Sequence, residues 1–260
     1  MSLKRPLFLL MFLIIYSINP TICFALDPSS TGVVLLHGKG SEPIGLKSLA
    51  SALTTAGFSV ETPELPWSKN RNYDQPYEEA DIEIAGAIAT LKAKGIRQIV
   101  LAGHSLGAAA ALHNAVTDNG IIALVLIAPA HFPEGDAALK LASKSVAEAK
   151  QIVNSKNANQ ISDFVEVPSG RLLTLPASIY LSYYDPQGPS AMSLFAPEVK
   201  VKNIAWFAAS SDPATDKFST LVVPNLPSNI QLNRIDIISD HAHSPDIAKD
   251  IVVDWLKALQ

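Results

Sequence analysis

A serine between glycines is the residue of this chain whose surroundings best suit covalent chemistry. It lies in the run Gly103-His104-Ser105-Leu106-Gly107, after the apolar segment 98–102 and before the alanine-rich segment 106–116. A serine on a sharp turn from a strand into a helix exposes its hydroxyl above the edge of a sheet, where it can act as a nucleophile. The plainer interpretation is a serine that caps the following helix. Because an apolar strand pattern precedes the turn, we favour the interpretation of Ser105 as a nucleophile.

A serine hydroxyl needs a base to remove its proton and a carboxylate to orient that base. The chain has six histidines, namely His37, His104, His113, His131, His241 and His243. The base must reach the serine from another strand end, which disfavours His104, the neighbour of the serine, and His113, which lies within a predicted helix. His241 and His243 are also conceivable as a metal pair, but no cluster of further ligands is near them in sequence. We therefore predict no metal and no other cofactor.

Predicted strands and helices alternate along the chain and must position these residues. The strands are predicted at 32–37, 58–62, 98–102, 121–128, 203–209 and 230–238, and the helices at 46–56, 77–94, 106–116, 137–153 and 246–259. Several of these strands are continuous apolar runs, which is typical of strands buried on both faces of a sheet. Strands that alternate with helices pair in parallel through right-handed crossovers. The pattern therefore predicts an α/β fold with helices on both faces of a mostly parallel sheet.

With this order of elements around the serine turn, the chain resembles an α/β-hydrolase over nearly all of residues 26–260. In that family the acid commonly follows the strand two after the nucleophile strand, and the histidine follows the last strand. The resemblance therefore implies a catalytic triad of Ser105, Asp212 and His241, in the family's usual order of serine, acid and histidine. Asp212 lies in Ser211-Asp212-Pro213, and His241 lies in Asp240-His241-Ala242-His243.

Alternatives remain open for both partners of the serine. An aspartate before a proline is also a common turn residue, so Glu134 and Asp136, which follow the preceding strand, are alternative acids. His243, directly before the Ser244-Pro245 helix start, is the alternative base.

The resemblance also implies an oxyanion hole, in which two backbone N–H groups stabilise the charge on the substrate's carbonyl oxygen. By position these are the N–H groups of Lys39, in His37-Gly38-Lys39-Gly40 at the end of the first strand, and of Leu106, the residue after the serine.

The chain departs from the family pattern in two places. Too few residues precede the first strand of the domain for the usual N-terminal antiparallel hairpin, so we expect about six strands. Residues 133–200 are predicted to be a lid-like insertion, with a helix at 137–153 and then an irregular stretch rich in proline and tyrosine. We expect this insertion and the proline-rich loop 63–76 to shape the pocket, and we interpret Tyr180, Tyr183 and Tyr184 as packing residues.

Composition excludes several classes of protein. The chain has 260 residues, of which 48% are hydrophobic and 17% charged, and this is typical of a globular protein and not of a disordered one. Twenty Lys and Arg against 24 Asp and Glu give a formal net charge of −4, which disfavours a nucleic-acid partner. The single cysteine excludes an internal disulfide.

The first 25 residues have the pattern of a secretory signal peptide. Lys4 and Arg5 precede an apolar run over 7–16, and Cys23-Phe24-Ala25 resembles a cleavage site. The run is shorter than the roughly 20 residues that span a bilayer, so we expect no stable membrane anchor. Lipid attachment at Cys23 is the alternative, although the residues before it do not form the usual motif. We predict a signal peptide at 1–25 and an exported domain at 26–260.

These observations predict an exported serine hydrolase that cleaves a carboxylic ester, or a related acyl bond of a small molecule, through an acyl-enzyme on Ser105. A short ester is the default expectation, because the insertion lacks the long apolar surface of a lipase lid. The alternative is a non-catalytic exported module that retains the fold and binds a ligand or partner.

Overall fold

A six-stranded sheet forms the centre of the protein, and every neighbouring pair of its strands is parallel. The structure is a computed structural model that describes residues 26–117 and 120–259. The strands of the sheet are β1 (Thr31–Leu36), β2 (Ser59–Glu61), β3 (Gln98–His104), β4 (Ile121–Ile127), β7 (Asn203–Ala209) and β8 (Gln231–Ile237). The predicted mostly parallel sheet of about six strands is confirmed.

The strand order β2-β1-β3-β4-β7-β8 reverses direction beside β1. From β1 the chain moves outward to the edge strand β2, returns to β3 on the other side of β1, and then continues outward to β8. The topological switch point of the sheet therefore lies between β1 and β3, at the carboxyl ends of these two strands. In open α/β sheets this is where ligands bind.

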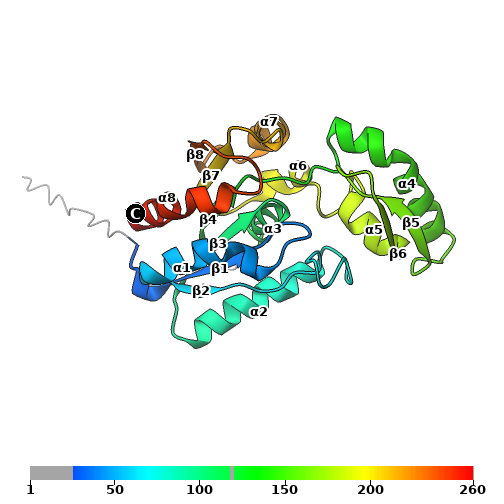
Figure 1. The fold of residues 1–260 in the computed structure, drawn as a ribbon. Helices are drawn as coiled ribbons and strands as arrows, with labels where there is room; N and C mark the ends of the chain where they lie inside the picture. The colour runs from blue at the N-terminus through cyan, green and yellow to red at the C-terminus, as the bar shows by residue number, and fades with distance from the viewer. Residues whose placement is uncertain (1–25, 118–119, 260) are drawn as a thin grey trace, which may run out of the picture.

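Helices cover both faces of the sheet (Figure 1). They are α1 (Lys47–Thr55), α2 (Glu79–Ala93), α3 (Leu106–Asn114), α4 (Asp136–Asn154), α5 (Ala177–Tyr184), α6 (Met192–Phe195), α7 (Ala214–Lys217) and α8 (Ser244–Ala258). Val33 and Leu35 of β1 pack in one apolar cluster with α1 and α8, whereas Val34 and Leu36 pack in another with α2 and α3. Because both faces of each central strand are buried, these strands are continuous apolar runs in the sequence.

The segment between β4 and β7 is more regular than we predicted. After α4 it forms an antiparallel hairpin of β5 (Ile161–Val165) and β6 (Leu172–Pro176), followed by α5 and α6. The prediction of an irregular stretch is therefore wrong. The strands are short and alternate between exposed and buried positions, as in Leu172, which is 60% exposed, and the buried Leu173, so no apolar run marks them. In Figure 1, α4, α5 and the hairpin lie together to one side of the sheet.

Tyr180, Tyr183 and Tyr184 lie on α5 and are buried. They belong to the same apolar cluster as the face of the sheet covered by α2 and α3. Their role in packing agrees with the interpretation from the sequence.

The first and last described parts of the chain meet at the amino edge of the sheet. Leu26, just before β1, donates its backbone N–H to the carbonyl of Leu259, just after α8, at 2.9 Å. The predicted signal peptide, residues 1–25, lies outside the described residues. Within residues 26–117 and 120–259, none of the helices has the length and apolar character needed to cross a membrane.

Candidate active site

Ser105 occupies a strained turn between β3 and α3. Its φ of 57° and ψ of −121° lie in a region that residues with a side chain rarely adopt. Its N–H donates to the carbonyl of Ile127 at 3.1 Å, and its own carbonyl accepts the N–H of Ala108 at 3.0 Å. These bonds to β4 and α3 hold the turn in a conformation that exposes the hydroxyl, as a nucleophile on a strand-to-helix turn requires.

The two glycines that flank the turn are required by close approach of the backbone. A Cβ at Gly103 would lie 2.1 Å from the carbonyl oxygen of Gly107. A Cβ at Gly107 would lie 2.1 Å from the carbonyl oxygen of Leu36 in β1. Both atoms belong to the backbone and cannot move aside, so only glycine lets α3 begin this close to the sheet.

Ser105, His241 and Asp212 form one hydrogen-bonded chain. The Ser105 hydroxyl lies 2.9 Å from His241 Nε2, and His241 Nδ1 lies 2.6 Å from Asp212 Oδ2. A carboxylate can only accept, so Nδ1–H donates to Asp212 and the lone pair of Nε2 is left to accept the Ser105 proton. The structure thus brings together the three residues that the sequence suggested as a triad.

Asp212 is buried yet remains a carboxylate. Burial alone would raise its pKa, but the hydrogen bonds from His241 and from the backbone N–H of Ala214, at 2.9 Å, hold the pKa below its usual value. The charge therefore persists through the neutral range and can stabilise a positively charged imidazole at His241.

His104 also contacts His241, and the sequence analysis did not predict this contact. Its Nε2 lies 2.9 Å from the backbone carbonyl of His241, and the two rings are 4.9 Å apart. Burial lowers the pKa of His104 to about 4, so at neutral pH its ring is uncharged and donates Nε2–H to that carbonyl. His104 thereby ties the loop that carries His241 to the serine turn.

The alternative residues lie elsewhere. The carboxylate of Glu134 accepts the backbone N–H of Ser193 at 3.0 Å, and Asp136 is an exposed residue in the first turn of α4. His243 is exposed and its Nδ1 pairs with Asp240 at 2.9 Å. None of the three has a contact with Ser105 or His241 among the interactions of the described residues.

The loop after β1 lies directly beside the serine. A Cβ at Gly38 would lie 3.0 Å from the Cβ of Ser105 and 3.1 Å from His104 Nδ1. The buried His37 accepts the N–H of Leu65 at Nε2, at 3.1 Å, and therefore donates Nδ1–H to the carbonyl of Gly38 at 2.9 Å. The His37 ring thus links the loop after β1 to the backbone at Leu65.

The backbone N–H groups predicted to form the oxyanion hole belong to Leu106, directly after Ser105, and to Lys39, directly after Gly38. Within the part of the chain that the structure describes, neither N–H has a hydrogen-bond acceptor. Free donors beside a nucleophile are what an oxyanion hole requires, because they are available to a developing negative charge.

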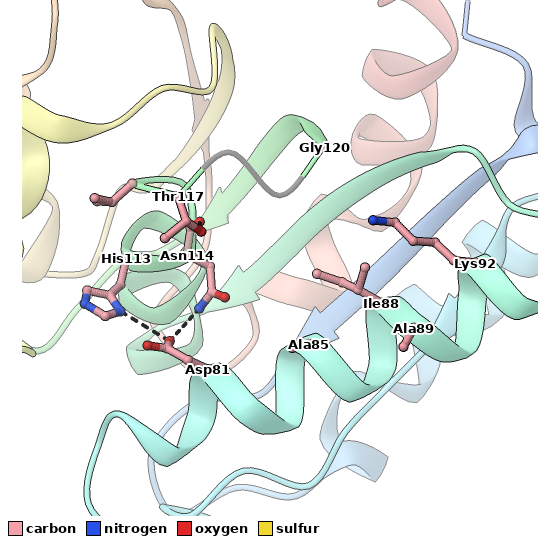
Figure 2. A pocket seen from close by; sticks show the side chains of 10 residues that line it. Asp81, Ala85, Ile88, Ala89, Lys92, His113, Asn114, Thr117 and Gly120 are labelled. Atoms are coloured by element: carbon pink, nitrogen blue, oxygen red, sulfur yellow. Dashed lines mark hydrogen bonds and ion pairs between the residues drawn. The ribbon is translucent and has the colours of Figure 1, made fainter.

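A surface pocket of about 710 Å³ lies away from these residues, between α2 and α3 (Figure 2). In this pocket Asp81 of α2 accepts hydrogen bonds from Asn114, at 2.8 Å, and from His113, at 3.2 Å. His113 and Asn114 lie at the carboxyl end of α3, whereas Ser105 precedes its amino end. We assign the chemistry to the residues at the carboxyl ends of β1 and β3, because this pocket contains no member of the hydrogen-bonded chain on Ser105.

Comparison with protein families matches residues 33–248 to the alpha/beta hydrolase family. The chain therefore belongs to this family, as the sequence resemblance suggested. Comparison with curated proteins gave no significant match.

Solved structures with the same fold include several hydrolases. A monoacylglycerol lipase of Paleococcus ferrophilus is 20% identical, with a TM-score of 0.62 over 90% of this chain and 96% of that one. A thermostable carboxyl esterase of Bacillus coagulans is 14% identical, with a TM-score of 0.62 over 90% of each chain. A metagenome-derived lipolytic enzyme is 16% identical, with a TM-score of 0.60 over 89% and 94%. At these identities the likeness establishes the fold alone, and the family membership makes the protein a hydrolase.

Proposed function

We propose that this hydrolase cleaves a carboxylic ester of a small molecule through an acyl-enzyme on Ser105. The observation that carries the proposal is the hydrogen-bonded chain from the Ser105 hydroxyl through His241 to Asp212 on a strained strand-to-helix turn. The names of two similar structures, a monoacylglycerol lipase and a carboxyl esterase, refer to the same class of bond.

In the first half of the reaction, Ser105 Oγ attacks the carbonyl carbon while its proton passes to His241 Nε2. The carbonyl electron pair moves onto the oxygen, which accepts hydrogen bonds from the backbone N–H groups of Lys39 and Leu106. As the carbonyl re-forms, the bond to the alcohol breaks and the departing oxygen takes the proton from Nε2. The acyl group is then bonded to Ser105.

In the second half, a water molecule attacks the acyl carbon and gives its proton to His241 Nε2. The bond to Ser105 breaks, Oγ regains the proton, and a carboxylic acid leaves. The net reaction converts an ester and water into an acid and an alcohol, and Asp212 stabilises the imidazolium at each stage.

We further propose that residues 133–200 shape the substrate pocket and that the substrate has a short acyl group. Tyr180, Tyr183 and Tyr184 of this segment are buried in the core and so are not available to a lipid chain.

Labelling with a fluorophosphonate probe tests the proposed mechanism. Such a probe bonds to an activated serine, so we expect stoichiometric labelling of the purified protein and none of Ser105→Ala. Folded wild-type protein that is neither labelled nor able to hydrolyse short esters would contradict the proposal and favour the non-catalytic binding module.

We also propose that the protein is exported and that residues 1–25 are removed. The positive charges, apolar run and small residues of this segment motivate the proposal. Intact-mass measurement of material recovered outside the cytoplasm is expected to give a chain that begins at Leu26. Retention of residues 1–25 in that material would contradict it.

A further inference from the structure

The Lys39 side chain leaves the loop beside Ser105 and enters the segment between β4 and β7. Its Nζ donates to the backbone carbonyl of Val167 at 2.5 Å and lies 3.3 Å from Glu166 Oε1. The Lys39 side chain is 20% exposed and that of Glu166 only 5%. A largely buried ammonium group is stable only where it is paired and hydrogen-bonded, so this contact is part of the folded structure and not a loose surface pair.

Glu166 is itself held from several directions. Its Oε2 accepts hydrogen bonds from Arg171 Nε at 2.5 Å and from the Ser169 hydroxyl at 2.6 Å, and its Oε1 accepts one from the Tyr73 hydroxyl at 3.1 Å. Burial would raise the pKa of Glu166, but these hydrogen bonds, with the charges of Lys39 and Arg171, lower the pKa to about 2. The carboxylate is therefore charged at every pH at which the enzyme is expected to work.

Other residues of the loop after β1 are held through their backbone. The Trp67 side chain donates to the carbonyl of His37 at 3.0 Å, the carbonyl of Gly38 accepts the N–H of Ser41, and Gly40 N–H donates to the carbonyl of Trp67 at 2.9 Å. The N–H of Lys39 has no such partner within the described residues. Lys39 is instead held through its side chain.

We propose that Lys39 is a positioning residue, whose side chain, held by Glu166 and the Val167 carbonyl, directs its own backbone N–H at the oxyanion formed on Ser105. The inference rests on the proposed function. It makes the segment between β4 and β7 a support of the catalytic loop, because Glu166 and Val167 both belong to that segment. A donor contributes most when it is already aligned with the position of the developing charge, so loosening this support should affect the transition state more than the bound ester.

The test compares Lys39→Met with Lys150→Met. Methionine keeps most of the length and apolar contacts of Lys39 but cannot pair with Glu166. Lys150 is the matched control, because it also pairs with a carboxylate of the segment between β4 and β7, Asp185 at 2.8 Å, but has no contact with Glu166 or the catalytic loop among the described residues. For Lys39→Met with 4-nitrophenyl acetate we expect kcat to fall roughly 10–100-fold and KM to stay within about twofold, since removing one oxyanion donor entirely costs about 10²–10³-fold. For Lys150→Met we expect kcat close to that of the wild type.

A short alkyl trifluoromethyl ketone gives a second readout. It forms a tetrahedral adduct with an active serine, and the anionic oxygen of this adduct occupies the oxyanion hole. Its affinity for Lys39→Met should fall by the same factor as kcat. Glu166→Gln, which keeps the shape but removes the charge, should reduce both quantities in the same direction and provides the test if Lys39→Met does not fold.

The outcomes separate this inference from the proposed function. Wild-type kcat and inhibitor affinity in folded Lys39→Met, or in Glu166→Gln where Lys39→Met does not fold, would overturn the positioning role, and so would an equal loss in Lys150→Met. Those results would leave the Ser105-dependent activity intact. A wild-type protein without Ser105-dependent esterase activity would instead overturn the proposed function, and with it this inference.

Discussion

At the scale of single residues, Asp212 is the group whose replacement changes the chemistry with the least change in shape. Asp212→Asn should leave the fold intact and lower kcat by roughly 10⁴-fold, because an amide no longer selects the His241 tautomer with a free lone pair on Nε2. Glu134→Gln is the matched control, since Glu134 follows β4 at the same edge of the sheet and its carboxylate is bound by Ser193 and not by His241. Steady-state kinetics with a short activated ester measure both. A collapse in Glu134→Gln or Asp136→Asn with little change in Asp212→Asn would move the acid to the end of β4.

The two neighbouring histidines provide a similar comparison. His241→Ala should lower kcat several-hundred-fold or more, because general-base catalysis alone typically contributes 10²–10⁴-fold. His243→Ala removes only an exposed pair with Asp240 and should retain most of the activity. Each variant is checked for folding by circular dichroism. The opposite pattern of losses would identify His243 as the base.

At the scale of elements, α3 packs very closely against β1 at Gly107. Gly107→Ala places a Cβ 2.1 Å from the Leu36 carbonyl oxygen, so α3 must move away from the sheet and carry Ser105 with it. We expect a loss of about 3 kcal/mol in the free energy of unfolding, at the upper end of overpacking costs, together with loss of activity.

Gly86 of α2 is the control for that substitution. A Cβ there meets nothing within 4 Å, so Gly86→Ala should stabilise the protein by about 0.5–1 kcal/mol, as expected for a glycine in a helix interior. Urea unfolding measures both changes. If the two variants shifted the midpoint in the same direction, the close approach at Gly107 would not be the cause.

The elements also show which parts of the fold could be predicted from the sequence. Central strands such as β4 and β7 were predicted closely, because burial on both faces leaves an uninterrupted apolar run. The hairpin of β5 and β6 was missed, because its strands are five residues each and half-exposed. The contact between Lys39 and Val167 joins residues 128 positions apart, and no local pattern in the sequence marks such a pair.

At the scale of the whole molecule, partly buried histidines should make stability depend on pH. Burial lowers the pKa of His131 to about 3, whereas a histidine in an unfolded chain has a pKa of about 6.5. The unfolded state therefore binds more protons than the folded state below about pH 6.5, and stability should fall as the pH drops toward 3. The slope for one such residue is at most about 1.4 kcal/mol per pH unit.

The variant His131→Asn tests whether His131 causes this dependence of the free energy of unfolding on pH. Asparagine tolerates the positive φ of 81° at this position and cannot take up a proton. Between pH 6.5 and 5 the free energy of unfolding from urea titrations should fall less steeply for the variant than for the wild type. Equal slopes would assign the pH dependence to other groups, among them His104.

The meeting of Leu26 and Leu259 determines how the protein can be attached to a support. Both residues lie at the amino edge of the sheet, whereas Ser105 and His241 follow strands at the carboxyl edge. A tether at either residue would therefore leave the edge of the sheet that carries Ser105 and His241 facing the solvent. We expect the protein to hydrolyse substrate equally fast when it is attached to beads through Leu26 and when it is attached through Leu259.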